Sequence, residues 1–330
     1  MHLRLPLPKS ILLETALLAL FLAAISALLI GNAYYTLLAA TVVLFSSMVV
    51  AWNVIGGYAG QLDLGAYAYM GFGGIITAEL WIKTGLPPII GIFVGGAASS
   101  LLAVLIGIPT FRFGIKEVWY ALLTAALVVI FNNIARLLMG PFDYYLPSDS
   151  GLLYLKFNNY ELMYAISSAF LLAAFLINFL IERSKVGYYL RAIREDELAA
   201  EMIGIDTRRY KLYALMIYSF LLGTMGYIYI VLAASFSYRI FDSSASLSIA
   251  IMGIIGGLGS VEGAIASSMI LRSLGEYFRS SFGSTFPGLD LLLYGTVLIL
   301  MGIFQPEGLV SMFNLIKRKL GVMTNERDHP

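Results

Sequence analysis

The residues best suited to bind another protein lie in one charged segment, residues 184–205, within a chain that is otherwise strongly apolar. Asp196 is a favourable N-cap and Gly204 a favourable C′ residue, so the segment predicts a helix of roughly two turns over residues 197–203. Three apolar side chains share one face of this helix. A charged helix with a small apolar ridge is typical of a docking element, and we expect it to bind a partner in the cytoplasm.

The alternative for this helix is a position flat on the membrane surface. Helices of that kind favour Lys and Arg on the polar face, whereas Glu197 and Glu201 make this one acidic. Just before it, Arg191 and Glu195 are spaced to form an i, i+4 ion pair. Apolar anchors dominate most interfaces, and charges at the rim add little. The predicted docking set comprises the apolar anchors Leu198, Met202 and Ile203 and, around them, Arg191, Arg194, Asp196, Glu197, Ala199, Ala200 and Gly204.

Two glycine-rich segments form the second candidate site: residues 53–65 (NVIGGYAGQLDLG) and 253–263 (GIIGGLGSVEG). Each glycine costs about 1 kcal/mol against alanine inside a helix, and broken backbone at membrane depth needs protein or a water-filled cavity around it. Gln61 and Asp63 lie in the first break, which favours a lined pathway or gate. Close helix packing through small residues is the alternative. The predicted pathway residues are Gly56, Gly57, Gly60, Gln61, Asp63, Gly65, Gly256, Gly257, Gly259 and Ser260.

Several kinds of chemistry are excluded by the residues that the chain lacks. It contains no cysteine, and its two histidines, His2 and His329, lie at its ends. This excludes a thiol nucleophile, a thiolate metal site and a histidine relay within the membrane. Neither G-x-x-x-x-G-K-[ST] nor G-x-G-x-x-G occurs. We therefore expect no metal site, no cofactor, no ATP site and no catalytic residues in this chain.

The composition indicates a polytopic membrane protein. Hydrophobic residues make up 59% of the 330 residues and charged residues 12%, against about 25% charged in soluble domains, and the mean hydropathy is +0.84. We expect an all-α fold of about ten transmembrane helices, with broken or re-entrant glycine-rich segments, because runs of about 20 apolar residues can cross the bilayer. The expected spans are roughly 11–30, 36–55, 65–82, 89–108, 118–138, 161–181, 211–234, 245–261, 263–280 and 290–305.

The basic residues predict the orientation of these spans. Most of the 21 Lys and Arg residues fall on one side when the N-terminus is placed in the cytoplasm, which is where such residues collect. We therefore expect one transmembrane domain over residues 1–330, with both termini, a loop at about 184–210 and a tail at about 306–330 in the cytoplasm. The longest outer segment is then 139–160, which is either a docking loop or a solvated connector with aromatic anchors.

Four segments of the chain carry a resemblance to a known family. They are residues 53–65 (NVIGGYAGQLDLG), 187–205 (GYYLRAIREDELAAEMIGI), 252–263 (MGIIGGLGSVEG) and 306–309 (PEGL). With them, residues of about 36–309 resemble the permease subunits of branched-chain amino acid ABC importers, the LivM-like family. Residues 187–205 are similar to the EAA loop of importer permeases.

Two departures from the family pattern accompany this resemblance. Leu198, Ala199, Ala200 and Gly204 occupy the E-A-A-x-x-x-G positions of the EAA loop, so a leucine replaces the acid. Residues 143–150 (DYYLPSDS) stand where a T-G-G-like element is common. The second departure bears on the substrate, since relatives of this family also carry urea, amides and aromatic acids.

The resemblance implies a type II ABC importer-like permease of the cell membrane that forms half of a translocation pathway. It implies as partners a second related permease, two cytoplasmic ATPase subunits that bind ATP, and an extracytoplasmic substrate-binding protein, with no nucleic acid. The implied substrates are branched-chain or other hydrophobic amino acids; urea, amides or aromatic acids are the alternative within the family. An ion-coupled secondary transporter is the alternative from another class, and it would favour acids or histidines in mid-span.

Overall fold

The structure is a computed structural model that describes residues 9–29, 31–115, 117–282, 292, 295, 296 and 299. The long helices in this part of the chain are α1 (Lys9–Leu29), α2 (Ala33–Trp52), α3 (Ala66–Thr84), α4 (Pro88–Arg112), α5 (Glu117–Met139), α6 (Tyr160–Glu182), α9 (Thr207–Ala233), α10 (Ser243–Gly256) and α11 (Val261–Phe282). The shorter elements are a π-helix (Asn53–Tyr58), α7 (Lys185–Glu195), α8 (Glu197–Met202), the strands β1 (Tyr144–Tyr145) and β2 (Ser235–Phe236), and 3₁₀ turns at Leu152–Tyr154 and Tyr238–Ile240.

The helices coincide with the first nine spans that the sequence predicts, and the tenth, 290–305, lies almost wholly outside the described residues. Six helical stretches are long and apolar enough to cross a membrane: Ala33–Tyr58, Pro88–Arg112, Val118–Met139, Tyr160–Glu182, Thr207–Ala233 and Tyr238–Gly256. The all-α polytopic fold is therefore confirmed, whereas the count of ten spans and the re-entrant segments stay predictions.

Local chemistry explains where several helices begin and end. The side chains of Asn32 and Asn159 accept hydrogen bonds from the first turns of α2 and α6 and act as N-caps. Pro88 is the first residue of α4. The amides of the first turn have no acceptor within the helix, so the N–H that proline lacks removes no helical hydrogen bond. Gly85 follows α3 at a φ of 71°. This left-handed conformation commonly ends a helix, and glycine adopts it without strain.

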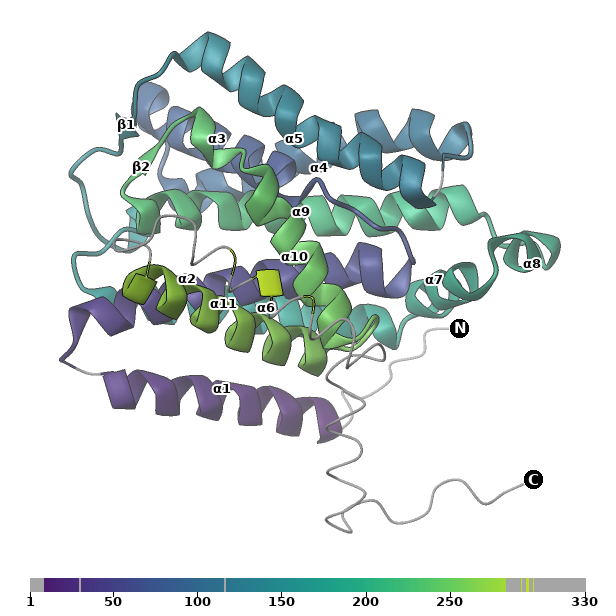
Figure 1. The fold of residues 1–330 in the computed structure, drawn as a ribbon, viewed down its shortest axis with the longest axis horizontal. Coiled ribbons are helices and arrows are strands. Elements are labelled where there is room, and N and C mark those ends of the chain that lie inside the picture. The colour runs from purple at the N-terminus through teal and green to yellow at the C-terminus, as the bar shows by residue number, and fades with distance from the viewer. Residues whose placement is uncertain are drawn as a thin grey trace.

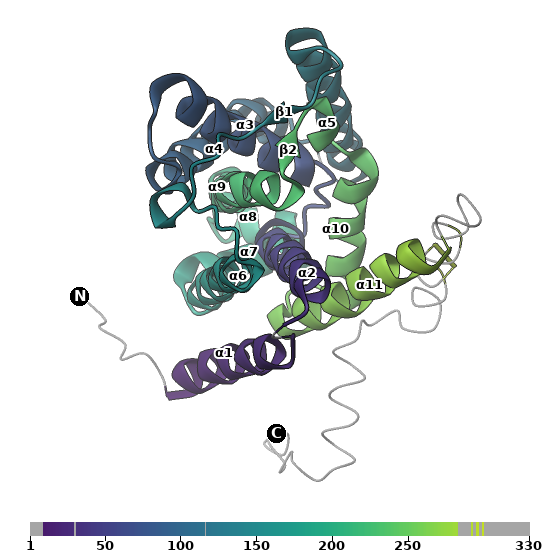
Figure 2. The same ribbon diagram turned by 90° about the vertical axis from the view of Figure 1, so that its left-hand side faces the viewer.

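Helix α2 forms the centre of the bundle. Figure 2, in which several long helices are seen nearly end on, places it among α6, α9, α10 and α11, and it packs against each of these four. In its most apolar stretch 83% of the residues are buried, against 17% in α5, which lies at the rim. The glycine-rich segment 53–65 therefore follows directly from the most central helix of the described chain.

Helices α3, α4 and α9 form a unit whose backbones touch through glycines. A Cβ added at Gly73 would lie 2.5 Å from the Cα of Gly223, and one added at Gly74 would lie 2.7 Å from the backbone of Gly226. Gly95 of α4 packs in the same way on the carbonyl of Gly73. Small residues let helix backbones approach this closely, as is common within membranes.

The two ends of the bundle carry different features. Helices α7 and α8 lie at one end, and the antiparallel pair of β1 and β2 lies at the other (Figure 1). This pair aligns Tyr144 with Phe236, whose rings stack at 5.8 Å, and so ties segment 139–160 to the chain before α10. The segment predicted to be outside and the loop predicted to be cytoplasmic thus lie at opposite ends of the molecule.

Candidate functional site

The predicted docking helix is present as α8. Asp196 caps it, because its Oδ1 accepts hydrogen bonds from the amides of Leu198 at 2.9 Å and Ala199 at 3.1 Å. Helix α8 ends at Met202, and Gly204 follows at a φ of 88°, where a side chain would be strained. The prediction of a short capped helix is confirmed, with its end one residue earlier than predicted.

Helix α8 presents the three predicted anchors to solvent. Leu198 is 68% exposed, Met202 88% and Ile203 77%, whereas Ala200 on the opposite side is 2% exposed. Contiguous exposed apolar side chains often mark a surface that binds a protein or a membrane. They form the apolar ridge of the candidate docking surface, which we define as Leu198, Met202 and Ile203.

Two polar contacts hold α8 against α9 in this orientation. The carboxylate of Glu197 lies 2.7 Å from the Nζ of Lys211, and Lys211 is almost fully buried beside the ring of Phe111. The hydroxyl of Thr207 donates to the carboxylate of Glu201 at 2.7 Å. Both acids of α8 therefore attach the helix to the bundle, although the sequence placed Glu197 among the rim contacts.

The prediction of an ion pair between Arg191 and Glu195 is wrong, because each residue has another partner. The guanidinium of Arg191 donates to the carbonyl of Glu182 at 2.9 Å and lies 3.7 Å from the carboxylate of the same residue. Glu182 ends α6, and the last carbonyls of a helix lack partners within it. The close succession of α6 and α7 thus offers Arg191 a better acceptor than its own helix does, and Glu195 pairs with Arg194 at 3.0 Å.

The first glycine-rich segment is irregular over its whole length. Helix α2 widens into a π-helix at Asn53–Tyr58, a form that often marks functional sites, and Gly56 packs on the indole of Trp52. The chain then leaves the helix at Gly60, at a φ of 66°. The predicted interruption of the second span is therefore present, and it lies at its C-terminal end.

Asp63 fixes this interruption inside the protein. Its carboxylate is fully buried and accepts hydrogen bonds from Tyr120 at 2.9 Å, Tyr218 at 3.1 Å and the amide of Gly65 at 2.8 Å. These donors come from α5, α9 and the start of α3, which are thereby joined at one point. Gln61 is buried nearby, and its Oε1 has no hydrogen-bond partner among the described residues.

The second glycine-rich segment is a tight turn between α10 and α11. Gly257 and Gly259 adopt φ values of 107° and 84°, and Gly256 packs directly on the backbone of the following helix at Gly263. The hydroxyl of Ser260 accepts a hydrogen bond from the amide of Gly263 at 3.1 Å, which helps to start α11. The two predicted spans 245–261 and 263–280 are therefore adjacent helices joined by this turn.

The structure brings the two glycine-rich segments together. The amide of Gly259 donates to Oδ1 of Asn53 at 3.0 Å, and a Cβ added at Gly57 would lie 2.7 Å from the nitrogen of Gly259. Asn53 also donates to Asn178 of α6 at 3.3 Å, and Asn178 in turn donates to the carbonyl of Val50 at 2.9 Å. The sequence analysis missed Asn178, although a fully buried amide in an apolar run is itself a signal.

Arg194 connects this meeting point to the docking segment. Its Nη1 donates to the carbonyl of Gly57 at 2.7 Å and reaches the carbonyl of Leu258 at 3.5 Å. The predicted docking set and the predicted pathway set are therefore in direct contact, which the sequence did not indicate. In the part of the chain that the structure describes, no group of three or more metal-ligating side chains lies close enough to hold an ion.

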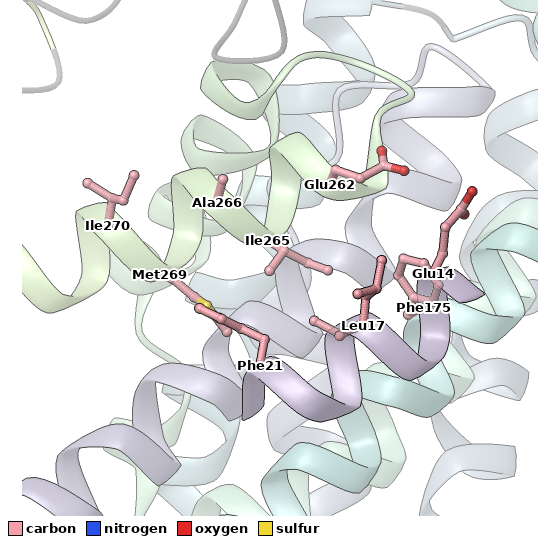
Figure 3. A pocket seen from close by; sticks show the side chains of 10 residues that line it. Glu14, Leu17, Phe21, Phe175, Glu262, Ile265, Ala266, Met269 and Ile270 are labelled. Carbon is pink, nitrogen blue, oxygen red and sulfur yellow. The ribbon is translucent and has the colours of Figure 1, made fainter. Parts of the chain in front are cut away.

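A separate groove of about 440 Å³ lies between α1 and α11. Figure 3 shows Leu17 and Phe21 of α1 facing Ile265 and Met269 of α11. The lining exposes almost only hydrocarbon, apart from Glu14 and Glu262 at one end. A lining of this kind suits a lipid chain better than a polar substrate, so the groove is not part of the candidate site.

Comparison with known proteins gave one family and two curated relatives. Residues 34–302 match the family described as branched-chain amino acid transport system / permease component. The chain is 30% identical over 157 residues to the high-affinity branched-chain amino acid transport system permease protein LivM of Escherichia coli K12, covering 47% of this chain and 36% of that protein. The LivM protein of Salmonella typhimurium is 30% identical over 141 residues, covering 43% of this chain and 32% of the relative. No solved structure matches.

Proposed function

Because the chain belongs to the branched-chain amino acid permease family, we propose that it is the membrane-spanning permease subunit of an ATP-driven importer. In this proposal it forms half of the translocation pathway in the cell membrane, with both termini in the cytoplasm. A second related permease forms the other half, two ATPase subunits bind at the cytoplasmic end, and a substrate-binding protein delivers substrate from outside. ATP is bound and hydrolysed by the partner subunits.

The exposed ridge on α8 is the observation that carries the ATPase part of the proposal. Leu198, Met202 and Ile203 project from a short helix at one end of the bundle, and the contacts of Glu197 and Glu201 hold that helix in place. A rigid helix with an apolar face is a common ligand for a hydrophobic groove in a partner. We expect the ATPase to supply that groove.

The glycine-rich segments support the pathway part of the proposal. Residues 53–65 and 257–260 are irregular backbone between long apolar helices, and the two segments touch each other. Irregular backbone at membrane depth is tolerated where protein surrounds it or where it borders a cavity. Since both breaks also contact Arg194 of the docking segment, they are suited to act as hinges or gates that respond to the ATPase.

For the substrate, the family description and the names of the two relatives favour branched-chain or other hydrophobic amino acids. Competition separates this class from the other substrates of the family. Uptake of labelled leucine by the reconstituted complex should be reduced by excess isoleucine or valine, and excess urea or benzoate should leave it unchanged. Reduction by excess urea or benzoate, with no effect of isoleucine or valine, would indicate a substrate of the urea, amide or aromatic acid class.

The docking proposal is tested with Met202→Asp. Met202 is 88% exposed, so the substitution costs the isolated chain little, but it places a carboxylate in an apolar groove of the partner. Loss of a central anchor typically costs at least about 2 kcal/mol, or about thirtyfold in affinity. We expect the ATPase to dissociate from the purified complex and uptake to stop.

Phe113→Asp is the matched control, since Phe113 is 78% exposed in the loop after α4 and lies outside α8. It should leave the ATPase bound. Retention of the ATPase and of uptake by Met202→Asp would refute the docking proposal. Uptake by this chain without any ATPase, driven by an ion gradient, would instead identify a secondary transporter.

A further inference from the structure

Arg194 lies in the last turn of α7 and reaches two segments that are 200 residues apart in the sequence. Its Nη1 donates to the carbonyl of Gly57, which belongs to the π-helix, and reaches that of Leu258, in the turn before α11. Carbonyls at or beyond the C-terminal end of a helix lack partners within it and attract cations. One guanidinium carries donors for several acceptors at fixed angles, so Arg194 suits both carbonyls.

The backbone approaches this side chain closely at two glycines. A Cβ added at Gly60 would lie 2.7 Å from the Cγ of Arg194, and one added at Gly259 would lie 2.9 Å from its Nη1. A cavity of about 320 Å³, lined by residues 59–61 and 193–198, continues from Gly60 along Arg194 to the start of α8. Gly60 and Gly259, both predicted pathway residues, must therefore be glycines, because a side chain at either position would collide with Arg194.

Arg194 is not what holds the two glycine-rich segments to each other. The hydrogen bond from the amide of Gly259 to Asn53 joins them directly, and Asn53 is in turn bonded to Asn178. What Arg194 adds is a link from both segments to α7. Through the short α7–α8 connection at Asp196, this link continues to the docking ridge.

We propose that Arg194 is a positioning residue that fixes both glycine-rich segments to α7, so that a displacement of α8 by its cytoplasmic partner moves both segments together. This inference rests on the function proposed above, and it deepens it. Removal of Arg194 should leave the chain folded and the ATPase bound, because neither Asn53 nor the docking ridge is altered. It should uncouple ATP hydrolysis from transport, so that less substrate is taken up for each ATP hydrolysed.

The test uses the complete complex in liposomes, with two substitutions at one position. Arg194→Met keeps an unbranched apolar stem and removes every donor, whereas Arg194→Lys keeps one charged donor on a side chain of nearly the original length. Bound ATPase, the rate of ATP hydrolysis and substrate taken up per ATP are measured for each. We expect Arg194→Met to retain the ATPase and lower uptake per ATP about tenfold, the factor that corresponds to one hydrogen bond to a charged group. Arg194→Lys should recover part of this loss.

Two neighbouring substitutions serve as controls. Glu195→Gln removes the ion-pair partner of Arg194 and keeps its bonds to the carbonyls. Lys185→Met removes an exposed cation from the first turn of the same helix and lies outside the docking set. Both should leave uptake per ATP within about twofold of the unaltered complex, because surface ion pairs contribute little. Unchanged uptake per ATP in Arg194→Met, or a loss equal in all three variants, would overturn the inference.

A double-mutant cycle tests the steric part of the link. Gly60→Ala places a methyl group against the Cγ of Arg194, and that atom is absent from Arg194→Ala. The strain of a side chain at a φ of 66° is common to both backgrounds, but the contact with Cγ is lost in one of them. The loss of uptake per ATP caused by Gly60→Ala should therefore be smaller in the Arg194→Ala background. Equal losses in both backgrounds would refute the contact.

If the unaltered chain binds no ATPase, the proposed function fails. If it binds the ATPase and transports while the Arg194 variants keep normal uptake per ATP, only the inference about Arg194 fails.

Discussion

Replacement of Lys211 by methionine should loosen α8 from the bundle. The substitution keeps the length and apolar stem of the side chain but removes the ammonium group 2.7 Å from Glu197. Loss of one partner from a buried ion pair costs about 3–5 kcal/mol. The side chain of Lys211 is 3% exposed but that of Glu197 is 17% exposed, and a partly exposed carboxylate regains some hydration. We therefore expect the free energy that docks α8 on α9 to fall by about 2 kcal/mol.

This loss can be measured because the chain contains no cysteine. In an Ala200→Cys variant the thiol replaces a side chain that is 2% exposed between α8 and the bundle, so it reacts with a water-soluble reagent only when α8 lifts. A fall of about 2 kcal/mol raises the open population, and hence the labelling rate, about thirtyfold. An Ile203→Cys thiol, exposed in both cases, gives the reference rate and should not change.

Equal labelling of Ala200→Cys with and without Lys211→Met would refute the role assigned to this ion pair. A rate that rises equally at positions 200 and 203 would also refute it, because it would report a general change rather than undocking. The pair of substitutions Glu197→Leu and Lys211→Met offers a further check. Apolar replacement of a buried ion pair is often neutral, so this combination should restore slow labelling.

Two other predictions concern topology and the pathway. In the cysteine-free chain, Ser148→Cys should react with an impermeant thiol reagent from outside intact cells and Thr324→Cys, which lies outside the described residues, should not; labelling of the latter would reverse the assigned orientation. Gly60→Leu and Gly257→Leu, at φ values of 66° and 107°, should abolish uptake by more than they reduce the amount of folded protein in the membrane. Loss of uptake in mere proportion to lost protein would show that the glycines serve packing alone.

Local patterns predicted the local features well. The apolar runs predicted the helices, because an apolar stretch of membrane length leaves the backbone few other ways to satisfy its polar groups. Asp196 and Gly204 predicted the two ends of α8 within one residue, since caps act on neighbouring amides and carbonyls. The glycines predicted where helix α2 and the turn before α11 become irregular.

The contacts between distant segments could not be predicted in the same way. The bond from Arg194 to Gly57 spans 137 positions and that from Tyr218 to Asp63 spans 155. Such pairs depend on the packing of whole helices, which periodicity along the chain does not specify. The Arg191–Glu195 pair shows the limit of spacing rules, because a nearby helix end supplied a stronger acceptor.

The glycine contacts among α3, α4 and α9 make these three helices a fixed frame. At Gly73, Gly95 and Gly223 backbone packs against backbone. The side chains beside these glycines, Ser99 and Thr77, are small and bonded to backbone carbonyls, so they leave little room for the rotamer changes that let one helix slide past another. Shear motion, in which packed helices shift by small side-chain rearrangements, is therefore suppressed within this trio. During transport we expect α3, α4 and α9 to keep their relative positions. Bending would then occur at segments 53–65 and 257–260, where the backbone already departs from the helix.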